Sequence, residues 1–269
     1  MIIMNNLSVS NRWKRIAKWT ILTSLLAAAC CQTQITAGWQ RPLQPSLAGG
    51  DLVCLSAHPL EASKFLVANR SQLFEGSGAS DWKMLWSDNR RGAGIESILT
   101  FPWVREHVFL VTSEKVLMGR IGDSSWSVVY DGGNREEKRP LSFAVMPRDA
   151  NEWYAGTPKG LWMSRDAGKT WARADIFSGT GAVAVLFAQG DKLFIGDENR
   201  LYLSLSGSPA REVFVLPQKE ADLSGLEAAE TGRTEDASYY VRQIRALVVG
   251  EDDPSHLFLG TRTGAFESL

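Results

Sequence analysis

One pattern of about 13 residues recurs five times along the chain and constrains its fold more than any other feature. Each copy consists of an apolar run, a polar turn and a second apolar run. The five copies read KFLVANRSQLFEG from Lys64, HVFLVTSEKVLMG from His107, EWYAGTPKGLWMS from Glu152, KLFIGDENRLYLS from Lys192 and HLFLGTRTGAFES from His256. The starting residues of successive copies lie 43, 45, 40 and 64 residues apart. Such a repeat indicates one supersecondary unit used several times.

Strand-length apolar runs flank these copies on both sides. The upstream runs lie at residues 52–56, 95–101, 141–146, 182–187 and 244–249. Downstream runs open on a tryptophan at residues 82–86, 126–130 and 171–176, and one without a tryptophan lies at 212–216. Four short strands in about 40 to 45 residues are typical of a propeller blade, and helical periodicity is nearly absent. The sequence therefore predicts an all-β protein, a β-propeller of four-stranded antiparallel blades with about five repeats visible.

The limits of this propeller domain are expected at residues 38–269, with an insertion at about 217–240. The insertion is polar and acidic, which predicts a surface loop or, alternatively, an excursion that binds a partner. The fifth copy ends after its third predicted strand, while Gly38-Trp39-Gln40-Arg41 resembles the start of a fourth strand. Either this N-terminal strand completes the last blade and closes the ring, which removes exposed sheet edges, or the blades are a fragment of a larger propeller.

The segment at residues 164–171, SRDAGKTW, matches the pattern S-x-D-x-G-x-x-W at every fixed position. It lies between the third and fourth predicted strands of a blade, and this placement resembles the BNR/Asp-box repeat family. That group includes sialidases, xyloglucan-degrading hydrolases and sortilin-type receptors. The GTxxGxxxSxDxGxxW run and the blade spacing are most similar to the WD40/YVTN/BNR-like and photosystem II stability/assembly-factor-like members. Related turns at residues 76–82 and 122–126 keep a tryptophan without the full pattern.

The residues of this box have structural roles that physical chemistry explains. Gly168 tolerates the positive φ that a short hairpin requires. Asp166, which follows Ser164 by two positions, can accept backbone N–H groups across the turn. Trp171 can bury a large apolar face against the adjoining blade. We therefore expect Ser164, Asp166, Gly168 and Trp171 to form a structural turn rather than a catalytic or metal site.

The first 37 residues have the layout of a signal peptide. A cluster of positive charges precedes an uncharged run of eleven residues, WTILTSLLAAA, which is too short to span a bilayer comfortably. A short membrane anchor is the alternative. Cleavage before Cys30 would make a lipoprotein, because the preceding AAA resembles a lipobox, although Ala27 stands where leucine is preferred. Cleavage after Ala37 would instead release a soluble secreted chain.

The cleavage site decides which cysteines remain in the mature chain and whether two of them can pair. If Cys30 carries a lipid, Cys31 and Cys54 remain and can pair in an oxidising compartment. If cleavage follows Ala37, Cys54 is a lone thiol within an apolar run and is expected to be a buried small hydrophobe. No cysteine spacing suggests a zinc site.

The net charge and the absence of several catalytic motifs limit the classes of function that the sequence supports. A net charge of −1 gives no electrostatic reason to expect nucleic acid. The three histidines, His58, His107 and His256, each lie beside a predicted loop, where we expect exposed side chains and no metal. Sialidase-like chemistry needs an acid and a tyrosine–glutamate pair, but Tyr239 and Tyr240 lie in the insertion, and no serine triad, HExxH or phosphate loop is present.

The resulting prediction is an exported, monomeric propeller without cofactors that binds a protein or ligand in the bacterial cell envelope. Its membrane contact would be limited to the signal peptide or a lipid anchor, in the periplasm, at the outer membrane or outside the cell. The alternative is a carbohydrate-active protein, either a glycoside hydrolase or a glycan-binding module. Because propellers support many functions, this choice depends on the family resemblance.

Overall fold

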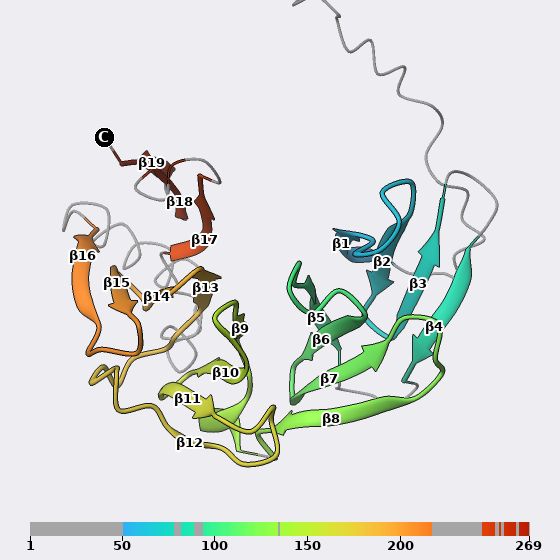
Figure 1. Cartoon of the computed structure of the whole chain (residues 1–269), viewed down its shortest axis with the longest axis horizontal. Coiled ribbons are helices and arrows are strands. Elements are labelled where there is room, and N and C mark those ends of the chain that lie inside the picture. Colours follow the sequence, from blue (N-terminus) through green and yellow to red (C-terminus); the bar gives the residue numbers. More distant parts are fainter. Residues whose placement is uncertain are drawn as a thin grey trace, which may run out of the picture. The chain divides into compact units, whose positions relative to one another are not determined.

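A computed structural model describes residues 51–77, 82–88, 94–133, 135–216, 244–250, 253, 256–261 and 264–268. The chain divides into two units, residues 1–44 and 45–269, and all described residues lie in the second. This unit contains five antiparallel sheets that follow one another along the chain (Figure 1). The sheets are the blades of a β-propeller, as the repeat predicts, and we number them blade 1 to blade 5 in chain order.

Each blade is a meander in which consecutive strands pair. Blade 1 consists of β1 (Leu52–Ala57), β2 (Phe65–Asn69), β3 (Gln72–Gly76) and β4 (Lys83–Ser87). Blade 2 consists of β5 (Ile95–Thr100), β6 (His107–Thr112), β7 (Lys115–Arg120) and β8 (Trp126–Asp131). Blade 3 consists of β9 (Ser142–Met146), β10 (Asp149–Thr157), β11 (Gly160–Ser164) and β12 (Ala172–Arg173). Blade 4 consists of β13 (Val185–Gln189), β14 (Lys192–Gly196), β15 (Arg200–Leu205) and β16 (Arg211–Val215). Blade 5 has three described strands, β17 (Ile244–Val249), β18 (Leu257–Thr261) and β19 (Ala265–Glu267).

A short polar side chain closes the hairpin between the second and third strands of every blade. In order along the chain these residues are Asn69, Thr112, Thr157, Asp197 and Thr261. The carboxamide or carboxylate accepts backbone N–H groups, as in Gln72 N to Asn69 Oδ1 at 2.7 Å, while each threonine hydroxyl donates to a carbonyl across the turn at 2.9 Å. This is the turn chemistry of Asx and hydroxyl side chains. These five positions therefore align the blades residue by residue.

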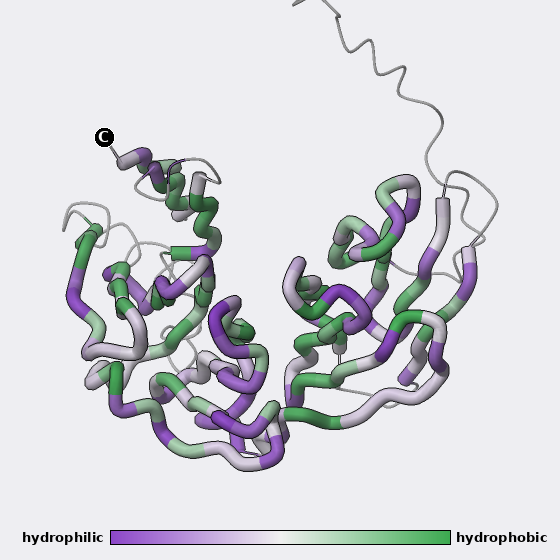
Figure 2. Tube along the Cα trace, in the orientation of Figure 1, coloured by the Kyte–Doolittle hydropathy of each residue, from purple (hydrophilic) through white to green (hydrophobic). Residues whose placement is uncertain are grey.

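The core lies between neighbouring blades, because the second strands of blades 1 to 4 bury both of their faces over most of their length. In β6, Val108 and Leu110 pack toward blade 1, whereas Phe109 and Val111 pack toward blade 3. All four side chains are at most 1% exposed, and hydrophobic residues are concentrated along the strands while turns are mostly hydrophilic (Figure 2). Burial of each such side chain contributes about 1.5 to 3 kcal/mol. The blades are therefore held together by face-to-face apolar packing.

The first strands of neighbouring blades also contact one another: β1 contacts β5, β9 contacts β13, and β13 contacts β17. The first strand of each blade is thus the innermost one. Helical structure in the described part of the chain is limited to a single 3₁₀ turn, η1 (Glu136–Lys138). No helix among the residues described has the length and apolar character needed to cross a membrane.

The predicted strands agree with the structure except at the end of blade 3 and the start of blade 4, where the run expected at residues 182–187 is β13, Val185–Gln189. The apolar pattern predicts one strand over residues 171–176, but β12 contains only Ala172–Arg173. The chain leaves the sheet edge there because Ala174, Ile176 and Phe177 are buried in the core between blades 3 and 4. The expected insertion at about 217–240 and the signal peptide at 1–37, with Cys30 and Cys31, lie outside the described residues.

Candidate functional site

The Asp-box segment forms a tight hairpin between β11 and β12. The Ser164 hydroxyl donates to Asp166 Oδ1 at 2.8 Å and accepts the backbone N–H of Gly168 at 2.9 Å. Thr170 donates to the same carboxylate twice, from its backbone N–H at 2.8 Å and its hydroxyl at 2.6 Å. The carboxylate of Asp166 is thus occupied by contacts within the turn.

Backbone geometry explains the glycine in this hairpin. Gly168 has a φ of +81°, in the left-handed region, and an added Cβ would lie 2.7 Å from the Trp153 ring. A larger residue is therefore excluded by conformation and by space. The hydrogen bonds from Thr170, together with the one from Ser164, lower the pKa of Asp166 to about 2. A carboxylate with so low a pKa cannot serve as a general acid near neutral pH.

A tryptophan links the Asp-box hairpin to the preceding blade. The indole N–H of Trp171 donates to the carbonyl oxygen of Val129 in β8 at 2.7 Å, and its ring meets Tyr130 edge-on at 4.9 Å. Blade 2 repeats the arrangement, because the indole N–H of Trp126 donates to the carbonyl of Leu85 in β4 at 3.1 Å. We call each arrangement an inter-blade tryptophan site.

Both accepting carbonyls belong to a bulge in the fourth strand of the preceding blade. Leu85 and Val129 are the extra residues at these register shifts, and an aromatic residue, Trp86 or Tyr130, follows each of them. Sequence alone indicates the spacing of the tryptophans but not this hydrogen bond, because donor and acceptor are about 40 residues apart. The sequence feature that could have indicated these sites is a tryptophan that recurs at the spacing of the blades.

The histidines are expected from the sequence to be exposed, and for His58 this expectation is wrong. Its side chain is fully buried beneath the turn between β1 and β2, whereas His256, with Nε2 2.7 Å from Glu267 Oε1, is exposed. His107 begins β6 and is partly buried. His58 lies in blade 1, His107 in blade 2 and His256 in blade 5, and the structure does not bring the three side chains to one site.

His58 lies in a cluster with Glu61 and Glu75 whose ligand atoms are within 4.8 Å of one another. Its Nδ1 accepts the backbone N–H of Glu61 at 2.9 Å, which leaves the ring proton on Nε2. Lys64 Nζ lies 2.6 Å from Glu61 Oε1 and 3.0 Å from Glu75 Oε1, and these contacts raise the pKa of Lys64. The ammonium group therefore bridges the two carboxylates, and Lys64, Glu61 and Glu75 form an ion-pair network beside His58.

The innermost strands provide little for glycoside hydrolysis. Among the residues of β1, β5, β9, β13 and β17, Glu96 is the single carboxylate, and it is exposed. Hydrolysis of a glycosidic bond normally requires two carboxyl groups about 5 to 10 Å apart. The first strands therefore supply one member of such a pair at most.

Cys54 in β1 is a free, half-buried thiol. Burial raises its pKa to about 11, so it is a poor nucleophile at neutral pH.

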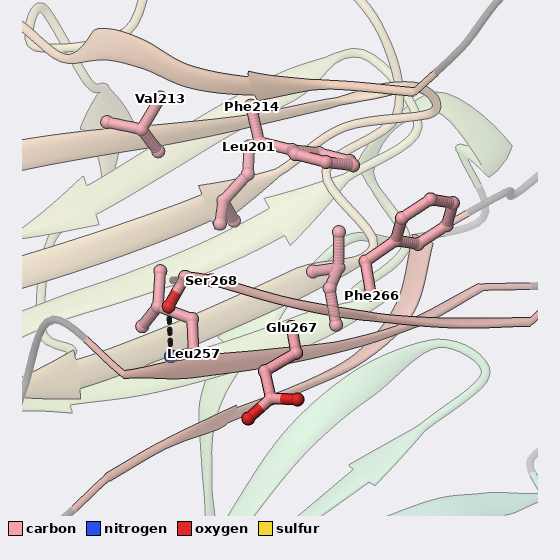
Figure 3. Close-up of a pocket in the computed structure, with 8 residues that line it drawn as sticks. Leu201, Val213, Phe214, Leu257, Phe266, Glu267 and Ser268 are labelled. Carbon is pink, nitrogen blue, oxygen red and sulfur yellow. Dashed lines mark hydrogen bonds between the residues drawn. The ribbon is translucent and has the colours of Figure 1, made fainter.

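An apolar groove lies between the outer strands of blades 4 and 5 (Figure 3). It has a volume of about 90 Å³ and is lined by Leu201, Val213, Phe214, Leu257, Leu259, Phe266, Glu267 and Ser268. Phe214 of β16 and Phe266 of β19 meet across it with ring centroids 5.3 Å apart. Among these described lining residues, Glu267 is the only charged one. Sequence alone does not indicate this groove, because its walls come from two blades separated by the insertion.

No protein-family model and no curated protein sequence matches the chain. Among solved structures, YCF48 from Cyanidioschyzon merolae has a TM-score of 0.57 at 13% identity, covering 85% of this chain and 71% of that chain. YCF48 bound to a D1 peptide has a TM-score of 0.55 at 11% identity, covering 85% and 67%. The GH74 enzyme of Niastella koreensis has a TM-score of 0.55 at 17% identity, covering 80% of this chain and 34% of that chain. This chain thus spans about a third of that enzyme. Similarity at these identities establishes the fold, which is a β-propeller.

Proposed function

We propose that this protein is an exported, non-catalytic β-propeller that binds another protein in the bacterial cell envelope. The observation that carries the proposal is the apolar groove between blades 4 and 5. Its lining includes Val213, whose side chain is 42% exposed although it is apolar. Exposed apolar surface that borders a groove is typical of protein interaction sites.

The chemistry of the remaining candidates supports binding over catalysis. Asp166 is held by its own turn, and the carboxylates beside His58 are paired with Lys64. Glu96 is the single carboxylate in the innermost strands. A propeller similar in fold, YCF48, has been solved with a D1 peptide, which is an example of this architecture holding a polypeptide. Export is supported by the charge cluster and the uncharged run within residues 1–37.

The first experiment separates binding from glycoside hydrolysis. The purified protein and its Glu96→Gln variant would be incubated with a panel of β-glucans, xyloglucan and sialosides, and released sugars would be quantified. We expect no release above a buffer control for either protein. Hydrolysis by the wild-type chain that disappears in Glu96→Gln would refute the non-catalytic proposal and support the carbohydrate-active alternative.

The second experiment tests partner and location in the native host. Cells expressing the tagged chain would be fractionated and treated with a lysine-reactive cross-linker, and cross-linked peptides would be identified by mass spectrometry. We expect the chain in the envelope fraction, linked to one predominant protein. The intact mass would distinguish a lipid-bearing Cys30 from a mature chain that starts at Gly38. A cytoplasmic, unlinked chain would contradict the proposal.

A further inference from the structure

The outer edge of blade 5 differs from those of the other blades. In blades 1 to 4 the third strand pairs with a fourth, whereas in the described part of blade 5 β19 pairs with β18 alone. The backbone N–H of Ser268 donates to Leu257 O at 2.9 Å, and Gly264 O accepts from Thr261 N at 2.8 Å. Both groups therefore point toward β18. Because backbone direction alternates along a strand, the N–H and C=O groups of Ala265 and Glu267 point toward the outer edge.

The equivalent edge in blade 3 shows what such groups bind. Leu161 follows Thr157 by four residues, as Ala265 follows Thr261, so the two occupy the same register position. Leu161 O accepts the backbone N–H of Ala174, the residue directly after β12, at 2.9 Å. The edge of β19 is thus arranged to accept an added strand.

The apolar groove occupies the place of an inter-blade tryptophan site. Val213 is the extra residue at the register shift of β16, as Val129 is in β8 and Leu85 is in β4. Phe214, which follows it, corresponds to Tyr130, the ring that Trp171 meets edge-on. The remaining apolar wall consists of Leu201, Leu257, Leu259 and Phe266, and Figure 3 labels three of these four. The groove therefore has the acceptor position and the aromatic wall that hold Trp171 at the boundary between blades 2 and 3.

We propose that blades 4 and 5 bind an extended, tryptophan-led segment of a partner protein. The segment adds to the edge of β19 as a fourth strand of blade 5, and its indole enters the groove with the N–H directed at the carbonyl of Val213. Main-chain hydrogen bonds supply affinity and the indole pocket supplies specificity, as in other cases of strand addition. This inference rests on the proposed function and names the chemistry of the partner.

The test uses a peptide that already has this pattern. A fluorescein-labelled peptide with the sequence of residues 169–175, KTWARAD, contains the tryptophan and fourth strand of blade 3. It would be titrated with the full chain, and binding followed by fluorescence anisotropy. We expect saturable binding that weakens about tenfold or more when the tryptophan of the peptide is replaced by alanine.

Matched variants of the full chain locate the binding. Val213→Glu places a charge in the groove and should abolish binding, whereas Val215→Glu changes a valine of similar exposure on the same strand that does not line the groove. Ala265→Pro removes one outward N–H and leaves the pairing of β19 with β18 in place. It should also weaken binding, by about tenfold. Thermal unfolding would establish that each variant is folded.

Three results would overturn the inference. Two of them are equal binding to wild type and Val213→Glu, and no binding to wild type. The third is binding that appears only in a Trp39→Ala variant, which would assign the groove to this chain's own Trp39; that residue precedes Leu52 by 13 positions, as Trp82 precedes Ile95. A partner cross-linked through another surface would leave the proposed function intact while the strand-addition site fails.

Discussion

Packing between blades makes a quantitative prediction about two phenylalanines at one register position. Phe109 and Phe258 each lie three residues before the threonine that closes their hairpin. Phe109 is 0% exposed and contacts Phe143 and Trp153, with ring centroids 5.3 and 5.5 Å away. Phe258 is 42% exposed. The same substitution at these positions therefore measures the value of the blade–blade interface.

Phe109→Ala should lower the free energy of unfolding by about 4 kcal/mol, because it removes a buried ring and leaves a cavity between blades 2 and 3. Phe258→Ala should lower it by about 1 kcal/mol, because its ring is only partly buried and solvent fills the space that it leaves. With an m-value of about 2.5 kcal/mol/M in urea, the unfolding midpoints should fall by about 1.6 M and 0.4 M.

Urea titration followed by tryptophan fluorescence measures both midpoints, with circular dichroism as a second probe of cooperativity. Midpoint shifts of equal size for Phe109→Ala and Phe258→Ala would refute the reasoning. They would mean that the face of blade 5 on which Phe258 lies is covered to the same degree as the interface between blades 2 and 3.

Three further predictions follow from single groups. Trp171→Phe should lower the free energy of unfolding by about 1 to 2 kcal/mol, because it removes the hydrogen bond to Val129 O and part of an apolar contact; a urea midpoint equal to that of wild type would contradict this. Cys54, with a pKa of about 11, should react with Ellman's reagent far more slowly at pH 8 in native protein than in urea, and equal rates would show that the thiol is not buried. Because the folded-state pKa of Asp166 is lowered from 3.8 to about 2, its ionised form stabilises the protein above about pH 4, and this contribution is lost as the pH falls toward 2. The difference in melting temperature between wild type and Asp166→Asn should therefore shrink from pH 6 to pH 2.5, and a constant difference would contradict the assigned turn contacts.

Most strands can be predicted from the amino-acid sequence alone. Apolar runs predict the strands at 52–56, 95–101 and 244–249, and the structure confirms them within a residue or two. The end of blade 3 is predicted less well, since Ile176 and Phe177 are buried toward blade 4 instead of continuing the strand. Propensity cannot decide such a case, because the competing contacts come from residues distant in sequence.

The candidate site is the part least accessible to sequence reasoning. The pattern at residues 164–171 is visible in the sequence, yet the carboxylate of Asp166 is held by Thr170 and Ser164 and offers no chemistry. His58 is expected at the surface and is buried, because the turn between β1 and β2 folds its ring over Glu75. The groove between blades 4 and 5 has no counterpart among the sequence predictions.

The sequence by itself determined the blade repeat, the polar turn within each copy and the spacing of the tryptophans. These features depend on residues within a few positions of one another, so a linear pattern expresses them fully. Tertiary structure alone decided that the bulge carbonyls of Leu85 and Val129 accept indole N–H groups, and that Val213 stands at the same position beside a groove. Those contacts join strands of different blades, and they exist only after hydrophobic packing has set the blades face to face.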